Sequence, residues 1–155
     1  MELREATEAD IPTLIEYWYA LATDNEPYSR FNELVYDSQA EVPADGFRNQ
    51  LERDGITNYL VEVQGETIGF VTLRDGEHSS RQYSRYLMIV NLYIKDAFQN
   101  RGHGTRVVEK VKELARAADC DHLKVSCEWH NVDARRFYTN TGFEEKQVTF
   151  VQSIE

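Results

Sequence analysis

A strand that leads through a glycine turn directly into a helix constrains this chain more than any other feature. Residues 89–94 read Ile-Val-Asn-Leu-Tyr-Ile, an apolar, β-branched and aromatic run that predicts a buried strand. A short polar turn over 95–100 follows, then Gly102 and Gly104, and then an apolar stripe at helical spacing from 105 onward. Strand, glycine turn and helix in this order form a layout typical of phosphate-binding sites.

The glycine turn has two interpretations when it is taken alone. Glycines let backbone N–H groups approach an anion without a Cβ in the way. The first turn of the helix directs unpaired N–H groups and the positive end of its dipole at the same point, and Arg101 adds a charge beside it. A strand-to-helix turn that simply needs two glycines has the same short pattern, so the loop alone does not decide between them.

Two motifs together resemble the acyl-CoA site of the GCN5-related N-acetyltransferase (GNAT) family. The first, Gln99-x-x-Gly102-x-Gly104 between the strand and the helix, resembles the pyrophosphate loop of that family. The second follows a further strand and reads Asn131-x-x-Ala134-x-x-Phe137-Tyr138-x-x-x-Gly142-Phe143. The motifs cover about 87–143, whereas the N-terminal half matches the family only in the order of its elements.

Periodicity along the chain predicts the element order β-α-α-β-β-β-α-β-α-β. The expected strands cover 3–6, 58–63, 67–73, 85–94, 122–129 and 145–154, and the expected helices cover 7–21, 44–53, 105–118 and 132–140. Residues 23–43 lack a clean period, and 74–84 read as a polar loop. This order predicts an α+β fold with a mixed β-sheet flanked by helices, and it matches the single-domain acyl-CoA N-acyltransferase (GNAT) fold. We expect residues 1–155 to form one such domain, with about 1–84 on the acceptor side and about 85–155 binding CoA.

Composition argues against several classes of protein. No apolar stretch approaches the length of a membrane span and the N-terminus lacks a signal-peptide pattern, so we expect a cytoplasmic protein without a membrane partner. A net charge of −10 and a pI of about 4.9 argue against a nucleic-acid partner. The acidity fits either a solvated acidic surface, as in a salty cytoplasm, or electrostatic steering of a cationic substrate.

The cysteines and histidines give no sign of a metal site. Cys120 and Cys127 fit no metal or redox spacing, and we expect both to be reduced, with Cys127 as a small core residue of a strand. The four histidines are scattered without ligand spacing. The predicted metal-binding set is therefore empty.

The resemblance implies how acetyl-CoA, the co-substrate, would bind. Backbone N–H groups of the glycine loop would hold the pyrophosphate, and the end of the central strand would pair with pantetheine through main-chain hydrogen bonds. In the family a bulge parts two parallel strands there and opens the cleft, so that an N–H near Leu92 would face the thioester oxygen. Asn131 would bind the pantetheine arm. The implied cofactor-binding residues are Leu92, Tyr93, Ile94, Gln99, Asn100, Arg101, Gly102, His103, Gly104, Thr105, Asn131 and Tyr138.

Acetyl transfer to an amine needs a proton acceptor and a proton donor. An alkyl ammonium has a pKa near 10.4 and must lose a proton before it attacks, while the leaving thiolate must gain one. The resemblance implies Tyr138 as the acid; its alternative is a core aromatic. Many family members carry a glutamate where this chain has Asn91, which cannot act as a base. Glu128 on the neighbouring strand is the first substitute, directly or through water, followed by His130 and Tyr93; alternatively, Glu128 is an exposed strand residue and water alone removes the proton.

The resemblance makes the irregular segment 23–43 the acceptor loop. Candidates to hold an amine are Asp24, Glu26, Tyr28 and Tyr36, and ordinary surface polarity is an equal alternative for each. We therefore predict an N-acetyltransferase that moves acetyl from acetyl-CoA to a primary amine of a small molecule or peptide, as a monomer or homodimer. The alternatives are a non-catalytic acyl-CoA-binding sensor, which Asn91 favours, and a structural domain with coincidental motifs.

Overall fold

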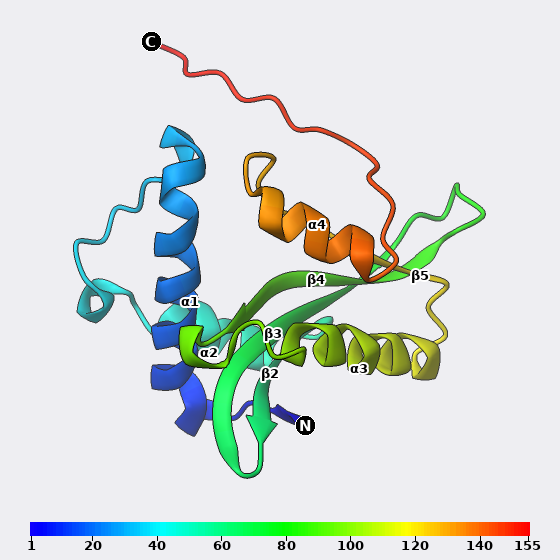
Figure 1. Ribbon diagram of the computed structural model, residues 1–155, viewed down its shortest axis with the longest axis horizontal. Helices are drawn as coiled ribbons and strands as arrows, with labels where there is room; N and C mark the ends of the chain where they lie inside the picture. The colour runs from blue at the N-terminus through cyan, green and yellow to red at the C-terminus, as the bar shows by residue number, and fades with distance from the viewer.

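The computed structural model describes residues 1–155 and contains one five-stranded sheet with helices on both faces (Figure 1). The strands lie in the order β1-β2-β3-β4-β5; the first four are antiparallel, and β5 runs parallel to β4. The mixed sheet and the α+β class predicted from the sequence are confirmed. The strands are β1 Glu2–Glu5, β2 Ile56–Val63, β3 Glu66–Glu77, β4 Arg85–Ile94 and β5 His122–Val125.

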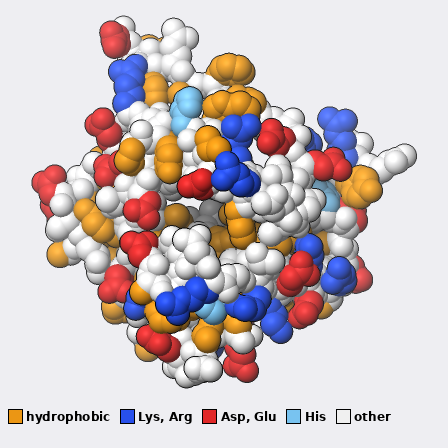
Figure 2. Space-filling view, in the orientation of Figure 1, with side chains coloured by type: hydrophobic (Ala, Val, Ile, Leu, Met, Phe, Trp, Pro, Cys, Tyr) orange, Lys and Arg blue, Asp and Glu red, His pale blue; other side chains and the backbone are white.

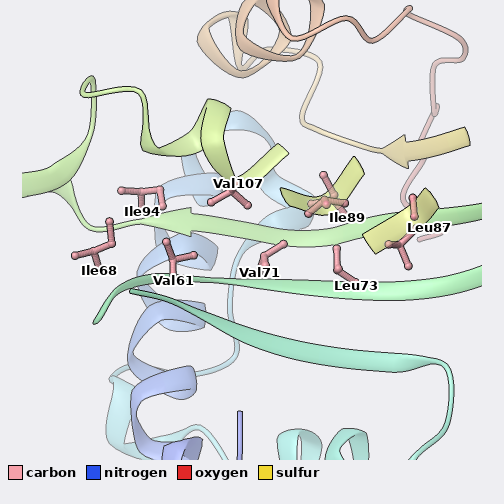
Figure 3. Packing of buried hydrophobic residues seen from close by; sticks show 10 residues of the cluster. Val61, Ile68, Val71, Leu73, Leu87, Ile89, Ile94 and Val107 are labelled. Atoms are coloured by element: carbon pink, nitrogen blue, oxygen red, sulfur yellow. The ribbon is translucent and has the colours of Figure 1, made fainter. Parts of the chain in front are cut away.

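Two apolar clusters hold the helices against the sheet. Helices α1 (Ile11–Asn25) and α2 (Asp45–Glu52) pack on one face, and α3 (His103–Ala117) packs on the other. Figure 3 shows Val107 of α3 lying against the sheet side chains of the second cluster. The first cluster comprises Ala6, Ile11, Leu14, Tyr17, Phe47, Leu60 and Phe70, and the second Val61, Ile68, Val71, Leu73, Leu87, Ile89, Ile94, Val107, Val111 and Ala115. No helix is both long enough and apolar enough to cross a membrane.

The 3₁₀ turn Glu8–Asp10, which leads into α1, shows why the sequence folds this way locally. The Thr7 backbone N–H donates to the Asp10 carboxylate at 2.8 Å, and the Asp10 N–H donates to the Thr7 carbonyl at 2.9 Å. The first bond is the capping-box contact in which the side chain at the third residue accepts from the N-cap N–H, with Asp in place of Glu or Gln; the second bond joins two backbone groups. Arg4 of β1 donates to both oxygens of the same carboxylate, at 2.9 and 3.0 Å, and so ties the first strand to the first helix.

A bulge in β4 separates it from β5. Thr72 lies opposite Asn91 while the next residue, Leu73, lies opposite Ile89, so Val90 is an extra residue in β4. Pairing between β4 and β5 ends at the same point, at Ile89 and Val125. Beyond the bulge, residues 90–94 keep β3 on one edge and have no strand on the other. The structure thus contains the parted strands that the family resemblance implied.

Several predicted elements differ from the structure in extent. The first helix, predicted over 7–21, begins at Ile11 after the 3₁₀ turn Glu8–Asp10 and continues to Asn25. β3 continues to Glu77, because the polar residues 74–77 pair in register with the first residues of β4, so the predicted loop 74–84 shrinks to 78–84. β5 ends at Val125 rather than at 129, because the bulge turns its neighbour away. Cys127 is consequently exposed rather than buried in a strand, and both cysteines are free.

The predicted final strand over 145–154 is absent. This segment has no neighbouring strand in the chain, and a strand cannot satisfy its backbone groups alone. It leaves the body after α4 (Val132–Asn140) and runs outward to the C-terminus (Figure 1).

Candidate active site

The loop between β4 and α3 is built to expose backbone N–H groups. Asn100 and Gly102 both adopt left-handed conformations, with φ of 61° and 82°, and Gly102 is the N-cap of α3. The first helical hydrogen bond runs from the Arg106 N–H to the Gly102 carbonyl at 3.1 Å, so the N–H groups at 103–105 have no helical acceptor. The Gln99 side chain donates to the Ile94 carbonyl at 2.7 Å and fastens the loop to the end of β4.

Gly102 and Gly104 are each required in this loop, for different structural reasons. Gly102 provides the left-handed turn, and a Cβ there would meet only the Arg106 side chain, at 3.7 Å. A Cβ on Gly104 would lie 3.1 Å from the Phe137 ring of α4. The sequence interpretation, which assigned both glycines to the approach of an anion, missed this contact. Gly104 lets the second motif pack directly on the first.

The electrostatics of the loop are positive despite the acidic chain. Arg106 lies 3.0 Å from Nδ1 of His103, and the Arg101 guanidinium lies 5.7 Å from the centre of the Phe98 ring. Partial desolvation, followed by the charges of Arg106 and Arg101, lowers the pKa of His103 below its usual value. The imidazole is therefore neutral at neutral pH, and the two arginines carry the charge at the start of α3.

The end of β4 offers main-chain groups rather than side chains. Leu92 and Ile94 pack toward α3, whereas Tyr93 packs toward α1, with its ring centre 5.6 Å from that of Tyr17. Burial, together with the charges of Asp96 and Asp24, raises the pKa of Tyr93, which makes it a poor base. The backbone edge that the bulge leaves without a strand along 90–94 remains, and of its groups the Ile94 carbonyl is taken by the Gln99 side chain.

Helix α4 carries the two predicted residues of the second motif. Oδ1 of Asn131 caps the helix by accepting from the Ala134 N–H at 3.0 Å, while its amide nitrogen makes no hydrogen bond within the chain. The Tyr138 ring lies between Phe137 and Phe143, with ring centres 5.0 and 5.5 Å away. Burial, with a smaller contribution from Cys127, raises the pKa of Tyr138 to about 12. Tyr138 is therefore both packed and protonated at neutral pH.

A cavity of about 230 Å³ lies between α1 and the parted strands. Figure 2 shows a hollow near the middle of the face it draws, between the regions of α1 and α4. One wall is the stripe of α1 at positions i, i+3, i+4 and i+7 from Trp18, and the opposite wall holds the polar groups. The lining residues are Trp18, Leu21, Ala22, Asn25, Asn32, Asn91 and Glu128.

Glu128 is oriented by the irregular segment. Its Oε1 accepts a hydrogen bond from Nδ2 of Asn32 at 2.7 Å, and the same nitrogen donates to the Asn25 carbonyl at 2.9 Å. The structure thus brings the predicted base and Asn91 into one cavity. His130, a weaker candidate for the base, is exposed in the turn before α4 and does not line the cavity.

The four predicted acceptor residues do not line the cavity. Asp24 is exposed at the end of α1, where partial burial and Asp96 raise its pKa. Glu26 accepts from the Leu34 N–H at 3.1 Å and so holds the loop, and Tyr28 is half-buried in a 3₁₀ turn. Tyr36 reaches the site only indirectly, because its ring packs edge-on against the cavity residue Trp18 at 6.4 Å.

Sequence reasoning missed five of the seven residues that line this cavity. Asn25 and Asn32 come from the predicted acceptor region but were not chosen. Trp18 and Leu21 lie in the predicted helix 7–21, and Ala22 directly follows it, without any predicted site role. The available signal was the spacing of Trp18, Leu21, Ala22 and Asn25, which is one face of a helix.

A buried row of hydrogen bonds ends at Asn91. Nδ2 of Asn91 donates to the Thr72 hydroxyl at 3.2 Å, and that hydroxyl donates to Oδ1 of Asn58 at 2.6 Å. Nδ2 of Asn58 then donates to Oε1 of Gln50 on α2 at 2.9 Å. Thr72 and Asn58 are each 1% exposed. The row occupies the side-chain nitrogen of Asn91. The side-chain oxygen Oδ1 of Asn91 makes no hydrogen bond within the chain.

Solved structures of other proteins share this fold. A tetramutant of a Bacillus halodurans protein superposes with a TM-score of 0.84 at 15% identity, and the match covers 99% of this chain and 100% of that one. An aminoglycoside N-acetyltransferase in complex with CoA superposes with a TM-score of 0.70 at 16% identity, covering 98% and 93%. The fold is that of the N-acetyltransferases.

The sequence comparisons then give the family. The model of the Acetyltransferase (GNAT) family matches residues 15–143, and this chain belongs to that family. An uncharacterized N-acetyltransferase of Methanocaldococcus jannaschii is 25% identical over 146 residues; the match covers 94% of this chain but only 62% of that relative. YhfO of Bacillus subtilis, also an uncharacterized N-acetyltransferase, is 27% identical, covering 94% and 91%. The thialysine N-epsilon-acetyltransferase of Bos taurus is 23% identical, covering 92% and 84%.

Proposed function

We propose that this protein transfers an acetyl group from acetyl-CoA to the primary amine of an aliphatic acceptor bound in the cavity between α1 and the parted strands. One observation carries the proposal. Asn91 lies in the stretch of β4 whose edge is unpaired, and it also lines the cavity opposite the α1 wall together with Glu128. An extended carrier paired to that edge would therefore lie directly beside the cavity.

The residues of the loop fit the carrier of the acetyl group. Two left-handed residues, three N–H groups without helical acceptors and the nearby Arg101 and Arg106 suit a pyrophosphate. The free backbone edge of 90–94 suits the amides of pantetheine, and the unused amide of Asn131 supplies a further donor. When bound, acetyl-CoA supplies the activated acetyl thioester.

The cavity suits an alkyl amine. Trp18, Leu21 and Ala22 provide an apolar wall for an aliphatic stem, and the carboxylate of Glu128 provides the only charge. A cation beside an indole ring gains a further electrostatic attraction. The bovine relative is named for the epsilon-nitrogen of thialysine, an amine of this kind, and that name supports the same class of acceptor.

Glu128 and Asn91 have different roles toward the amine: Glu128 accepts its proton and Asn91 orients it. Asn32 occupies Oε1 of Glu128, which leaves Oε2 to bind the ammonium and to receive its proton directly or through water. The free side-chain oxygen of Asn91 accepts a hydrogen bond from a second N–H of the amine and so orients the amine. Because the neutral amide of Asn91 cannot act as a base, Glu128 takes the role that a glutamate on the central strand has in other family members.

Tyr138 serves the leaving group. A phenol with a pKa of about 12 stays protonated and can donate a hydrogen bond to the departing thiolate. Its ring packing against Phe137 and Phe143 holds that donor in place.

Steady-state release of CoA with a panel of alkyl amines tests the proposal. We expect turnover by the wild type, a fall of about 10²- to 10⁴-fold in Glu128→Gln, and a fall in kcat in Tyr138→Phe without loss of acetyl-CoA binding. Glu33→Gln and Tyr83→Phe are matched controls, because both residues are exposed outside the cavity. Binding of acetyl-CoA without turnover of any amine would instead favour the acyl-CoA sensor.

A further inference from the structure

Glu128, the proposed base, lies on a stretch of chain that no neighbouring strand holds in place. β5 ends at Val125 and α4 begins at Val132, so Glu128 lies between two regular elements. Its backbone carbonyl accepts from the Asn131 N–H at 3.0 Å, a contact within the same turn. A glutamate side chain also has several rotatable bonds, and fixing them costs conformational entropy. The carboxylate therefore needs a further contact to keep one orientation toward the acceptor.

Asn32 supplies that contact from 96 residues away, and it is the only residue of 26–43 that lines the cavity. Its Nδ2 donates to Oε1 of Glu128 at 2.7 Å and to the Asn25 carbonyl, at the end of α1, at 2.9 Å. A side-chain amide nitrogen carries two hydrogens, and both are used here. Because the amide is planar, the bond to the Asn25 carbonyl directs the second N–H at Glu128. The end of α1 is thus the fixed reference for the carboxylate.

The short turn that carries Asn32 has hydrogen bonds of its own. Asn32 ends the 3₁₀ turn Arg30–Asn32, and its backbone N–H donates to the Ser29 carbonyl at 3.0 Å. The Ser29 hydroxyl caps the turn by accepting from the Phe31 N–H at 3.2 Å. These bonds shape the turn but do not involve Glu128. The turn can therefore be loosened at Ser29 without removing a partner of the base.

We propose that Asn32 is a positioning residue for the acetyl transfer, through which the fold of the segment 26–34 sets the orientation of the Glu128 carboxylate. The inference rests on the proposed function, in which Oε2 of Glu128 receives the proton of the ammonium. Asn32 exchanges no proton itself. Without its N–H the carboxylate rotates, and Oε2 faces the ammonium for only part of the time. The attraction between the carboxylate and the ammonium depends mainly on their separation, so Asn32 should affect kcat more than KM.

A purely structural role for Asn32 makes a different prediction. In that case Asn32 only fastens its segment to α1 through the Asn25 carbonyl. Its loss would then loosen one wall of the cavity, raise KM for the amine, and act as any other change that loosens the same turn. Ser29→Ala is such a change, because it removes the cap of the turn and leaves the contact between Asn32 and Glu128 in place.

Steady-state kinetics with the best alkyl amine of the panel tests the positioning role. In Asn32→Ala we expect kcat to fall about 10- to 100-fold, the effect of a displaced reacting group, with little change in KM. Asn32→Asp keeps the shape of the side chain but has no N–H donor and repels Glu128, so its kcat should fall at least as far. Ser29→Ala should keep the wild-type kcat. All three variants should keep the thermal shift given by acetyl-CoA, which shows that each is folded.

A double-mutant cycle with Glu128→Gln completes the test. Once the base is removed there is no proton acceptor to orient, so adding Asn32→Ala to Glu128→Gln should lower kcat no further. An equal further fall in that background would overturn the positioning role. An unchanged kcat in Asn32→Ala, or a fall of the same size in Ser29→Ala, would overturn it as well. A wild type that acetylates no amine refutes the proposed function itself, and so is distinguished from a failure of this inference alone.

Discussion

Replacing Thr72 by Val tests the buried row that ends at Asn91. Valine keeps the shape of threonine but removes the hydroxyl, so no cavity is created and only the hydrogen bonds change. Oδ1 of Asn58 then loses its 2.6 Å donor in a site that is 1% exposed. A buried acceptor without a partner costs about 1–3 kcal/mol, and we expect the free energy of unfolding to fall by that amount.

Thr72→Val should also change the binding of the amine, separately from its effect on the free energy of unfolding. Without the Thr72 hydroxyl, the Asn91 amide loses the 3.2 Å bond that holds its nitrogen away from the cavity. We expect a higher KM for the amine with little change in kcat or in the affinity for acetyl-CoA. The assays are urea denaturation and steady-state kinetics with the best alkyl amine of the panel.

Two further variants serve as controls. Thr72→Ser keeps the hydroxyl and should retain the wild-type KM, with a stability loss of about 1 kcal/mol for the buried methyl group. Asn58→Leu combined with Thr72→Val removes both polar partners, and such double replacements are often nearly neutral for stability; it should recover stability but not KM. If Thr72→Val matches the wild type in both stability and KM, the row neither stabilises the sheet nor orients Asn91.

Three other changes probe separate parts of the molecule. The Arg4 guanidinium is the main cause that lowers the pKa of Asp10; the stability from this pair is present above the unfolded-state pKa near 3.9 and is lost as pH falls through the lower folded value. In Asp10→Asn the free energy of unfolding, measured with urea, should therefore depend less on pH below about pH 4 than in the wild type. Gly104→Leu should push the Phe137 ring, 3.1 Å from the added Cβ, and abolish the thermal shift given by acetyl-CoA. Trp18→Ala should raise KM for alkyl amines and leave acetyl-CoA binding intact.

The controls for these changes come from the same chain. Gly46→Ala has open space around the new Cβ and lies in α2, so it should keep the acetyl-CoA shift. Saturation at about 100 times the dissociation constant adds about 2.7 kcal/mol, a rise of roughly 5–11 °C for a domain of this size. An undiminished rise in Gly104→Leu would contradict the packing of the two motifs on each other.

Local patterns in the sequence were sufficient for much of the fold. The strand over 85–94 and the helix over 132–140 have the predicted bounds, and α2 differs by one residue at each end. These elements are set by apolar period, caps and breakers, which are properties of neighbouring residues. The glycine loop and the second motif were likewise visible, because each is contiguous.

Tertiary structure alone decided the rest of the site. The end of β5 and the length of β3 depend on pairing with β4, which the Val90 bulge interrupts, and no local signal marks that residue. The cavity joins positions more than a hundred residues apart, from Trp18 to Glu128. In the sequence, Asn91 was only the residue at the position of the family's glutamate; the structure adds its hydrogen-bond partners on β3 and β2.

The sequence by itself therefore determined the class of fold and the motif positions. Only the tertiary structure decided what each part contacts: that Gly104 accommodates Phe137, that Glu128 faces α1, and that the C-terminal segment has no partner in its own chain. The physical reason is range. Propensity and period act between residues close in sequence, whereas pairing, burial and side-chain orientation depend on surfaces that meet only after the chain has folded.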